Sequence, residues 1–244
     1  MFDLTGRTAL VTGAGQNVGA GIAKALAHQG ATVVVNDLRA DFAQAVADEI
    51  NHDGGSAIMS AFDVTDLDAV RAAVDALGPV DILVNNAGVG GEHPLAVQPF
   101  REMDPSAWDG PIQVNLYGVL HCCKAVIDGM CERRWGRIIT ISSGAGTAGT
   151  RIGVSPYSAG KGGGIAFTRT LALEVARSGV TANSLALGLM TLGDAETEAI
   201  ARTIPVGRTG TPADVGAACV WLASEEAAWV TGQTIEINGG SITT

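Results

Sequence analysis

The sequence is poor in charged and aromatic side chains, and it contains no run of basic residues. Of its 244 residues, 16% are charged and 5% are aromatic, and 25 acidic residues against 15 basic ones give a net charge of -10. Proteins that bind DNA or RNA carry a basic patch that meets the phosphate backbone. The sequence therefore argues against a nucleic-acid partner, and its acidic balance mainly favours solubility.

Cysteine is scarce too, and long apolar runs are missing. None of the four cysteines has zinc-ligand spacing with histidines, and three lie in one apolar, helix-like stretch (122–131), as expected of small buried side chains in a reducing compartment. The sequence contains no run of about 18 apolar residues, the length that could span a membrane. The N-terminus (1–7) has no basic region followed by an apolar run, so no signal peptide is expected. We expect a cytoplasmic protein with no metal site and no membrane contact.

What is present is a regular alternation of apolar, β-branched runs with longer Ala-rich segments. The expected strands are Thr8–Val11, Thr32–Val35, Ala57–Phe62, Ile82–Val84, Arg137–Ile141, Val180–Leu185 and Thr234–Ile237. The expected helices are Val18–Gln29, Asp41–His52, Leu67–Ala76, Trp108–Met130, Tyr157–Arg177 and Ala213–Ala223. Continuous apolar strands with helical crossovers are typical of a parallel sheet covered on both faces. The pattern predicts an α/β fold: a Rossmann-type, doubly wound parallel sheet of about seven strands.

Domain organisation follows from what interrupts this alternation. No linker, low-complexity tract or domain-length repeat is present, so one domain is expected over residues 1–244. The segment Leu189–Gly207 is loop-like and breaks the alternation late in the chain. It is the best candidate for a mobile lid over a substrate.

The first strand runs into the segment TGAGQNVG (12–19), which opens a helix. Glycines at such a turn let the backbone approach a pyrophosphate, and the helix N-terminus supplies free N–H groups. The spacing is not the strict G-x-G-x-x-G, because Gly19 lies one position further on. A tight turn with a helix cap is the alternative interpretation.

Asp37 ends the second strand, about 20 residues beyond the glycines, where a carboxylate can accept hydrogen bonds from the adenosine ribose. It would repel the extra phosphate of NADP, and Leu38 offers no positive charge there, although Arg39 is close. The sequence therefore favours NAD, unless Asp37 merely caps the next helix. Asp63-Val64 could contact adenine or form a plain turn, and Asn85–Gly88 suits a crowded crevice or an ordinary turn.

Tyr157 and Lys161 are four positions apart and share one face of a predicted helix. Their free side chains titrate near ~10 and ~10.4. In a cleft, the Lys161 ammonium would favour the phenolate, lower the pKa of Tyr157 and make the phenol usable in proton transfer. The same pair is common on solvent-exposed helices, so other motifs must decide.

Together these motifs resemble the short-chain dehydrogenase/reductase family, from LTGRTALVTG (4–13) to TGQTIEINGG (231–240). The marks occur in order: the Thr-Gly-rich turn, Asn-Asn-Ala-Gly, an asparagine in the long helix expected over Trp108–Met130, Ile-Ser-Ser and Tyr-x-x-x-Lys. The resemblance implies a Rossmann-type single domain, a nicotinamide cofactor, and a homotetramer or dimer. It places the dimer interface on the Gly-rich helix that begins at Tyr157 and on the long helix before it.

The resemblance also implies four catalytic residues. Tyr157 is the general acid/base, and Lys161 lowers its pKa and holds the nicotinamide ribose. Ser143 orients the substrate oxygen, with Ser142 as the rival serine. Asn115 helps to hold a water in a proton relay, or is a structural amide. The predicted cofactor-binding residues are Gly13, Gly15, Gln16, Asn17, Val18, Gly19, Asp37, Leu38, Asp63, Val64, Asn86, Ala87, Gly88, Tyr157, Lys161, Gly188 and Met190.

The chain departs from the family pattern in three places. Asn17 replaces the middle glycine of the turn, and asparagine is the residue that best tolerates a left-handed backbone after glycine. Leu187-Gly188 replaces a Pro-Gly pair, which leaves the assignments of Met190 and Thr191 open. About one extra residue lies between Ser143 and Tyr157.

Substrate contacts are expected from three loops, 89–95, 144–155 and 189–205. Arg151 could pair with an anionic substrate or be a solvated loop residue, and His93 is expected on the surface. The sequence favours an NAD-dependent oxidoreductase acting on a secondary alcohol or its ketone. The alternatives are an NADPH-dependent reductase of 3-oxoacyl thioesters and, more remotely, an NAD-binding sensor or scaffold without turnover.

Overall fold

A parallel sheet of seven strands forms the centre of the computed structural model, which describes residues 1–89, 95–190, 199 and 201–243. The strand order is β3-β2-β1-β4-β5-β6-β7, and every neighbouring pair is parallel. The strands are β1 (Thr8–Val11), β2 (Thr32–Asp37), β3 (Ser56–Ala61), β4 (Ile82–Asn85), β5 (Gly136–Ser143), β6 (Val180–Leu187) and β7 (Thr234–Ile237). The order reverses between β1 and β4, as in a doubly wound dinucleotide-binding sheet, and the predicted fold class is confirmed.

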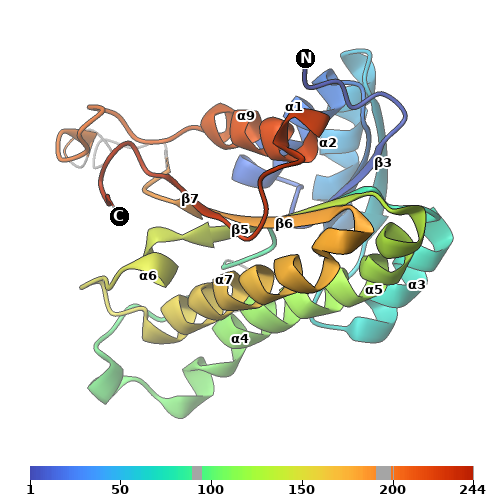
Figure 1. Cartoon of the computed structure of the whole chain (residues 1–244). Coiled ribbons are helices and arrows are strands. Elements are labelled where there is room, and N and C mark those ends of the chain that lie inside the picture. The colour runs from blue at the N-terminus through green and yellow to red at the C-terminus, as the bar shows by residue number, and fades with distance from the viewer. Residues whose placement is uncertain (90–94, 191–198, 200, 244) are drawn as a thin grey trace.

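Helices cover both faces of the sheet (Figure 1). One face carries α1 (Asn17–His28), α2 (Ala40–His52) and α9 (Pro212–Ala223), and the other carries α3 (Leu67–Leu77), α4 (Asp109–Ile112), α5 (Gly118–Arg133) and α7 (Ser155–Val175). The short helix α6 (Gly144–Thr147) lies beside the end of β5. Single 3₁₀ turns occupy Phe100–Glu102, Pro105–Ala107, Ala176–Ser178 and Glu225–Ala227.

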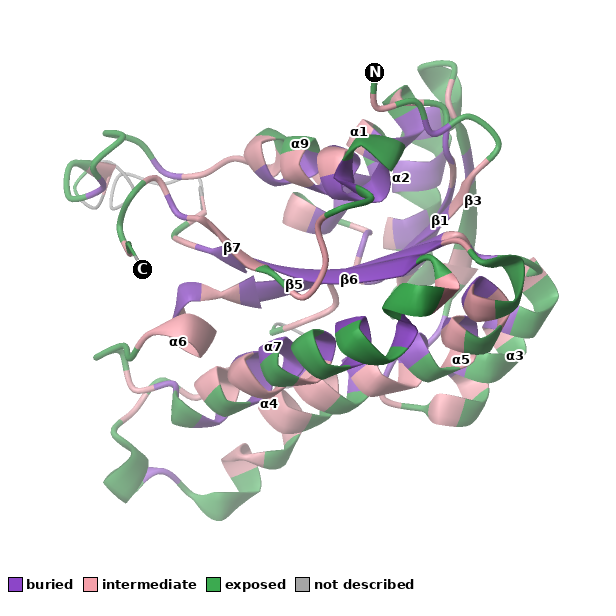
Figure 2. Ribbon diagram, in the orientation of Figure 1, coloured by how far each residue is buried: buried purple, intermediate pink, exposed green. Residues whose placement is uncertain are grey.

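The core explains why the central strands are apolar throughout. Side chains alternate along β1: Ala9 and Val11 join the cluster under α1 and α9, whereas Leu10 joins the cluster under α3, α5 and α7. All eight residues of β6 are buried, and Figure 2 shows the central strands as the buried layer between two helix layers. Each large aliphatic side chain buried there contributes roughly 1.5–3 kcal/mol relative to exposure.

The long helix expected over Trp108–Met130 is wrong in one respect, because it is not continuous. A π-helical turn, Gln113–Tyr117, separates α4 from α5. Its centre is Asn115, whose side-chain N–H donates to the main-chain oxygen of Pro111 at 2.8 Å. Extra residues of this kind in a helix occur frequently at functional sites.

Several smaller expectations can be compared with the described residues. All four cysteines are free, but Cys131 is half-buried, whereas the other three are buried as expected. The structure describes no helix long and apolar enough to cross a membrane. The segment expected as a lid lies partly outside the described residues, at 191–198 and 200, and so does His93. The start of that segment is paired with the chain further on, since Gly210 N–H donates to the Leu189 carbonyl at 2.9 Å.

Candidate active site

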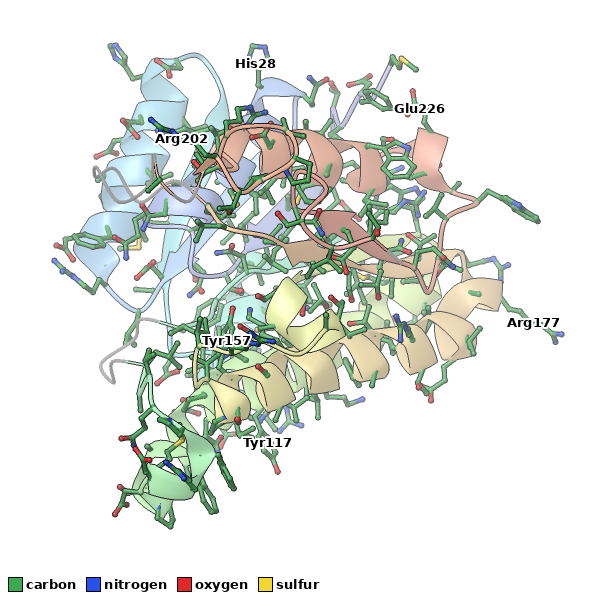
Figure 3. All side chains as sticks on the ribbon, turned by 90° about the vertical axis from the view of Figure 1, so that its left-hand side faces the viewer. His28, Tyr117, Tyr157, Arg177, Arg202 and Glu226 are labelled. Carbon is green, nitrogen blue, oxygen red and sulfur yellow. The ribbon has the colours of Figure 1, made fainter. Side chains whose placement is uncertain are left out.

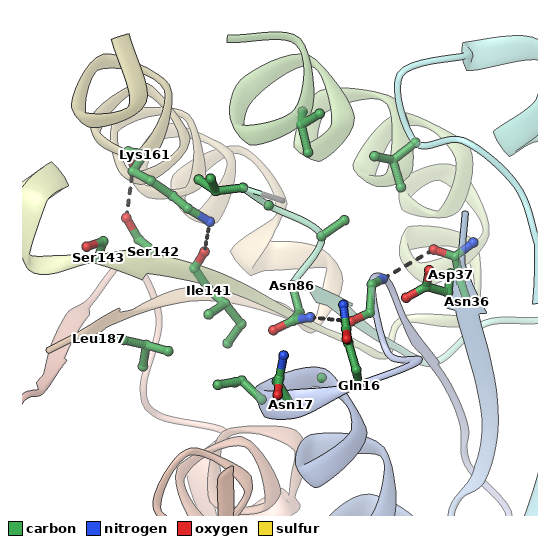
Figure 4. A pocket seen from close by; sticks show the side chains of 18 of the residues that line it. Gln16, Asn17, Asn36, Asp37, Asn86, Ile141, Ser142, Ser143, Lys161 and Leu187 are labelled. Atoms are coloured by element: carbon green, nitrogen blue, oxygen red, sulfur yellow. Dashed lines mark hydrogen bonds between the residues drawn. The ribbon is translucent and has the colours of Figure 1, made fainter. Parts of the chain in front are cut away.

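The carboxyl ends of β1 to β6 open into one cleft with a cavity volume of about 380 Å³, within the range typical of ligand sites. It lies at the point where the strand order reverses, which is where open α/β sheets bind ligands. All the predicted site residues line this cleft except Gly15 and Asn115. Segments far apart in the sequence thus meet at one edge of the sheet, as Figure 4 shows.

The turn between β1 and α1 has the backbone that its sequence suggested. Gly13 has φ 59° and Asn17 has φ 49°, both in the left-handed region. Asn17 therefore adopts the left-handed backbone conformation expected of a glycine at this position. A Cβ on Gly13 would lie 2.8 Å from Ala87 Cα, and one on Gly19 would lie 2.6 Å from Asn86 Nδ2. The turn is consequently packed as closely as its glycines permit.

Asn86 and Thr12 bind the turn to the end of β4. The Asn86 side-chain N–H donates to the carbonyls of Thr12 and Gly13, both at 2.9 Å. The Thr12 hydroxyl in turn accepts from the backbone N–H groups of Asn86 and Ala87, both at 3.0 Å. Asn-Asn-Ala-Gly is therefore not an ordinary surface turn, because its second amide shapes the glycine turn across the cleft.

The carboxylate of Asp37 faces the same turn. It accepts hydrogen bonds from the backbone N–H groups of Gly15 and Arg39, both at 3.1 Å. Asp37 is not the N-cap residue of α2, but its carboxylate bonds the backbone N–H of the N-cap residue Arg39, so contact with the helix start and a place at the glycine turn are compatible. The guanidinium of Arg39 pairs with Asp41 at 2.7 Å and stacks 3.6 Å above the Phe42 ring.

Asp63 has the local role of a turn residue as well as a place in the cleft. Its carboxylate accepts from the Thr65 N–H and hydroxyl, both at 2.8 Å. Val64 beside it also lines the cleft. The two interpretations of Asp63-Val64 are therefore compatible.

Tyr157 is the third residue of α7 and lies in its first turn, and Ser143 is the last residue of β5. In Figure 3, Tyr157 lies above the first turns of α7, toward the sheet, whereas Tyr117 lies below that helix. Burial raises the pKa of Tyr157, and a hydrogen bond with Ser143 partly offsets the rise. We expected Lys161 to lower this pKa, and that expectation is wrong for the protein by itself.

The reason is the position of the Lys161 side chain. It is 7% exposed, and its ammonium donates to the Ile141 main-chain oxygen at 2.8 Å while lying 6.0 Å from the centre of the Tyr157 ring. Burial lowers the pKa of Lys161 to about 8. The ammonium form therefore still predominates at pH 7, but the structure directs it at a carbonyl rather than at the phenol.

Asn115 lies just behind the cleft lining. Its side-chain oxygen is buried and has no hydrogen-bond partner among the described residues. A Cβ on Gly88 would lie 3.2 Å from this oxygen and 3.2 Å from Lys161 Nζ, so the glycine leaves a small space that both polar atoms face. An unpaired buried acceptor beside a buried ammonium is the kind of group that an ordered water satisfies.

The last predicted cofactor residues, Gly188 and Met190, follow β6. Gly188 packs so closely on Asn238 that a Cβ would lie 2.8 Å from that residue's Cα. Met190 lines the cleft and pairs with Gly210 in an isolated bridge, whereas Thr191 lies outside the described residues.

Sequence reasoning missed some residues of the site. Asn36 carried no prediction, yet its amide donates to the carbonyls of Ser60 and Phe62 and accepts from Gly13 N–H at 3.4 Å. The signal was a polar residue at the end of an apolar strand. The apolar lining residues Phe62, Val89, Val114, Ile141 and Leu187 gave no such signal.

The residues present fit a dinucleotide. The first turn of α1 holds no acidic side chain, and its N-terminus faces the cleft, which favours an anionic pyrophosphate. The bare backbone at Gly13 and Gly19 leaves room for close approach. Asp37 at the far end of the turn offers carboxylate oxygens to hydroxyl groups.

Comparison with known protein families agrees with this geometry. The model of the short chain dehydrogenase family matches residues 7–201, more than half of the chain. The chain belongs to the short-chain dehydrogenase family. It is therefore an NAD(P)-dependent oxidoreductase that acts on CH–OH or C=O groups, and it binds a nicotinamide cofactor.

Individual relatives of this short-chain dehydrogenase cover almost all of its length. It is 38% identical to the 3-oxoacyl-[acyl-carrier-protein] reductase FabG of Vibrio harveyi, with 98% of both chains covered. Among solved structures, a 3-oxoacyl-[acyl-carrier protein] reductase with bound NAD from Brucella melitensis has a TM-score of 0.93 and 34% identity, covering 99% of this chain and 94% of the other. A gluconate 5-dehydrogenase from Burkholderia cenocepacia in complex with NADP and tartrate has a TM-score of 0.90 and 34% identity, covering 98% and 96%.

Proposed function

We propose that this short-chain dehydrogenase transfers a hydride between NAD and a secondary alcohol or the corresponding ketone, with Tyr157 as general acid and base. The observation that carries the proposal is one cleft that contains the hydrogen-bonded pair Tyr157 and Ser143, the buried ammonium of Lys161 and the glycine turn. Such an arrangement supplies a proton carrier, an oxygen-orienting hydroxyl and an anion-binding turn at the same edge of the sheet.

When bound, the nicotinamide ring supplies the hydride acceptor or donor. The chain supplies position and proton transfer. The Ser143 hydroxyl donates to the substrate oxygen and holds it beside the Tyr157 phenol. In ketone reduction Tyr157 gives its proton to the developing alkoxide, and in alcohol oxidation its phenolate takes the proton from the hydroxyl. Lys161 would hold the nicotinamide ribose hydroxyls. After ketone reduction it would return a proton to Tyr157, and its own proton would be replaced through a water beside the Asn115 oxygen.

The raised pKa of Tyr157 bears on the direction of the reaction. A phenol whose pKa lies above its ordinary value is protonated at neutral pH and can donate to a carbonyl oxygen directly. Alcohol oxidation needs the phenolate, so its rate should rise with pH toward the pKa of Tyr157. The positively charged oxidised nicotinamide would lower that pKa in the oxidising complex.

The function is tested with a panel of secondary alcohols and ketones, each offered with NAD(H) and NADP(H). Formation or loss of reduced cofactor is followed by absorbance. We expect turnover with at least one alcohol and ketone pair and a higher kcat/KM with the NAD(H) form. Tight cofactor binding without turnover across the whole panel would favour a sensor or scaffold instead.

The preference for NAD is proposed from the position of Asp37. Its carboxylate is fixed by two backbone N–H groups at the turn, and Arg39, the nearby cation, pairs with Asp41 instead. A phosphate on the adenosine ribose would meet the negative charge of Asp37, and among the described residues the neighbouring cation, Arg39, is already paired. A variant without the negative charge of Asp37 should therefore show a weaker preference for NAD over NADP.

Asp37→Asn keeps the side-chain shape and removes the charge. We expect the ratio of kcat/KM for NADPH over NADH to rise at least ~10-fold, equivalent to about 1.4 kcal/mol of transition-state discrimination. Asp75→Asn is the matched control. Asp75 is an exposed carboxylate on α3, and its substitution removes the same charge away from the cleft. An unchanged ratio in Asp37→Asn, or an equal rise in the control, would remove Asp37 as the determinant.

A second candidate is an NADPH-dependent reductase of 3-oxoacyl thioesters. The observation that favours it is the 38% identity to a relative named 3-oxoacyl-[acyl-carrier-protein] reductase over nearly the whole chain. Both candidates use the same proton-transfer residues, so they differ in cofactor and substrate alone. Including a 3-oxoacyl thioester with NADPH in the panel separates them.

Three further proposals concern partners and segments. The exposed Arg151 has no partner among the described residues and is free to meet an anionic substrate. Residues 189–207 would act as a substrate lid on the single domain.

We also propose a homo-oligomer that uses α7, because Leu173 on that helix is 80% exposed. Size-exclusion chromatography should show a species larger than the 24.8 kDa chain.

A further inference from the structure

Ser142 is a buried hydroxyl in the cleft that the proposed mechanism does not use. It is 3% exposed, and its hydroxyl donates to the main-chain oxygen of Lys161 at 3.1 Å. Figure 4 shows this bond beside the bond from the Lys161 ammonium to the Ile141 carbonyl. Two consecutive residues of β5 therefore hold the two ends of one lysine.

The face of β5 on which Ser142 lies is the face that contacts α7. Thr140 is two residues earlier and so shares that face. Its hydroxyl is 2.9 Å from the hydroxyl of Thr168, which in turn donates to the Gly164 carbonyl at 2.8 Å. Two buried hydroxyl groups of β5 thus bond α7, one at Lys161 and one about two helical turns further from the cleft.

The helix turn at Lys161 is also confined from the side of α6. A Cβ on Gly146 would lie 2.9 Å from the backbone nitrogen of Gly162 and 3.1 Å from Lys161 Cβ. The Lys161–Gly162 peptide therefore packs directly on the α6 backbone, while Ser142 fixes its distance from the strand. Since the next residue of that strand is Ser143, the same contact sets the placement of Lys161 relative to Ser143.

We propose that Ser142 is a positioning residue for Lys161. Its hydroxyl fixes the register between the strand end that carries Ser143 and the helix turn that carries Lys161, without touching substrate or cofactor. The inference rests on the proposed function, in which Lys161 holds the nicotinamide ribose and returns the proton. In that complex, unlike in the protein by itself, the positive charge of Lys161 would favour the phenolate of Tyr157. Among the described residues, the other groups that face Lys161 are neutral: the Asn115 amide, the Ser142 hydroxyl and the Ile141 carbonyl.

The test compares Ser142→Ala with Thr140→Val, which removes the other of these two hydroxyl bonds and leaves the contacts of Lys161 unchanged. Both variants should lose a similar amount of thermal stability, because each removes one buried hydroxyl bond. In Ser142→Ala we expect kcat for alcohol oxidation to fall about 10-fold and the rising limb of its pH profile to move to higher pH. In Thr140→Val we expect kcat to stay within 2-fold of that of the parent enzyme. The rising limb of its pH profile should lie at the same pH as in the parent.

Equal kinetic changes in the two variants, or an unmoved pH profile in Ser142→Ala, would overturn the proposal. If Ser142→Ala does not fold, Ser142→Cys keeps the approximate volume with a weaker donor and provides the same comparison. The parent enzyme and Tyr157→Phe separate this failure from that of the proposed function. Suppose that Ser142→Ala behaves like Thr140→Val while the parent enzyme turns over and Tyr157→Phe does not. The proposed function is then supported, and the role of Ser142 is refuted.

Discussion

Replacing Tyr157 with phenylalanine is expected to lower kcat about 10²–10⁴-fold, the range that general acid–base catalysis supplies. The substitution removes one hydroxyl and keeps the aromatic ring, so the wall of the cleft is retained. Ser143 loses the hydrogen bond that it shares with the phenol but still lies at the end of β5. The affinity for cofactor, measured by titration without substrate, should change less than about 3-fold.

The chain contains its own control for this experiment. Tyr117 is the other of the chain's two tyrosines, and it is 45% exposed on the far side of α7 from Tyr157 (Figure 3). Tyr117→Phe removes the same atom at a distance from the cleft and should leave kcat within 2-fold. Undiminished turnover in Tyr157→Phe would refute the assignment of the acid and base, whatever the effect on KM.

Changing Gly19 to alanine should weaken cofactor binding at least 100-fold. An added Cβ would clash with the Gly13 carbonyl and the Asn86 amide, two of the groups that form the turn. In a helix, alanine is favoured over glycine by about 1 kcal/mol, whereas overpacking costs roughly 1–3 kcal/mol. The clash therefore outweighs the gain, and relieving it displaces the backbone that would receive the pyrophosphate.

Gly149→Ala is the matched control for Gly19→Ala. A Cβ on Gly149 meets no atom within 4 Å, and its backbone is not in the left-handed region. Calorimetric titration of NAD into both variants, with thermal unfolding measured in parallel, gives the comparison. If Gly19→Ala is folded and binds NAD as tightly as Gly149→Ala, the close contact of Gly19 with the turn has no role in binding.

The strands could be located from the sequence because their hydrophobic character is local. β1 and β7 begin and end where expected, and β5 and β6 extend two residues past their expected ends. Those added residues are Ser142, Ser143, Ala186 and Leu187. They are small, polar or near a glycine, so apolar periodicity gives no signal there. They extend the sheet because each strand pairs with the other through these positions.

The site was harder to predict wherever it depends on distances between segments. Spacing alone put Tyr157 and Lys161 on one helix face, but it could not show that the Lys161 ammonium bonds the Ile141 carbonyl. Nor could it show that the desolvation of Tyr157 exceeds any stabilisation of its phenolate in the protein alone. The helix break at Asn115 was missed as well, because apolar periodicity read over the whole segment does not show where one extra residue enters a helix.

The bond from Asn86 to the turn at Thr12 has a consequence for synthesis on the ribosome. The two residues are 74 positions apart, and β1 pairs with β4 at a nearly equal separation, as in the pair Ala9 and Ile82. Non-local pairing of this kind is slow to form because the intervening loop must close first. The nucleotide turn, although encoded among the first twenty codons, cannot reach its final shape until the fourth strand has left the exit tunnel.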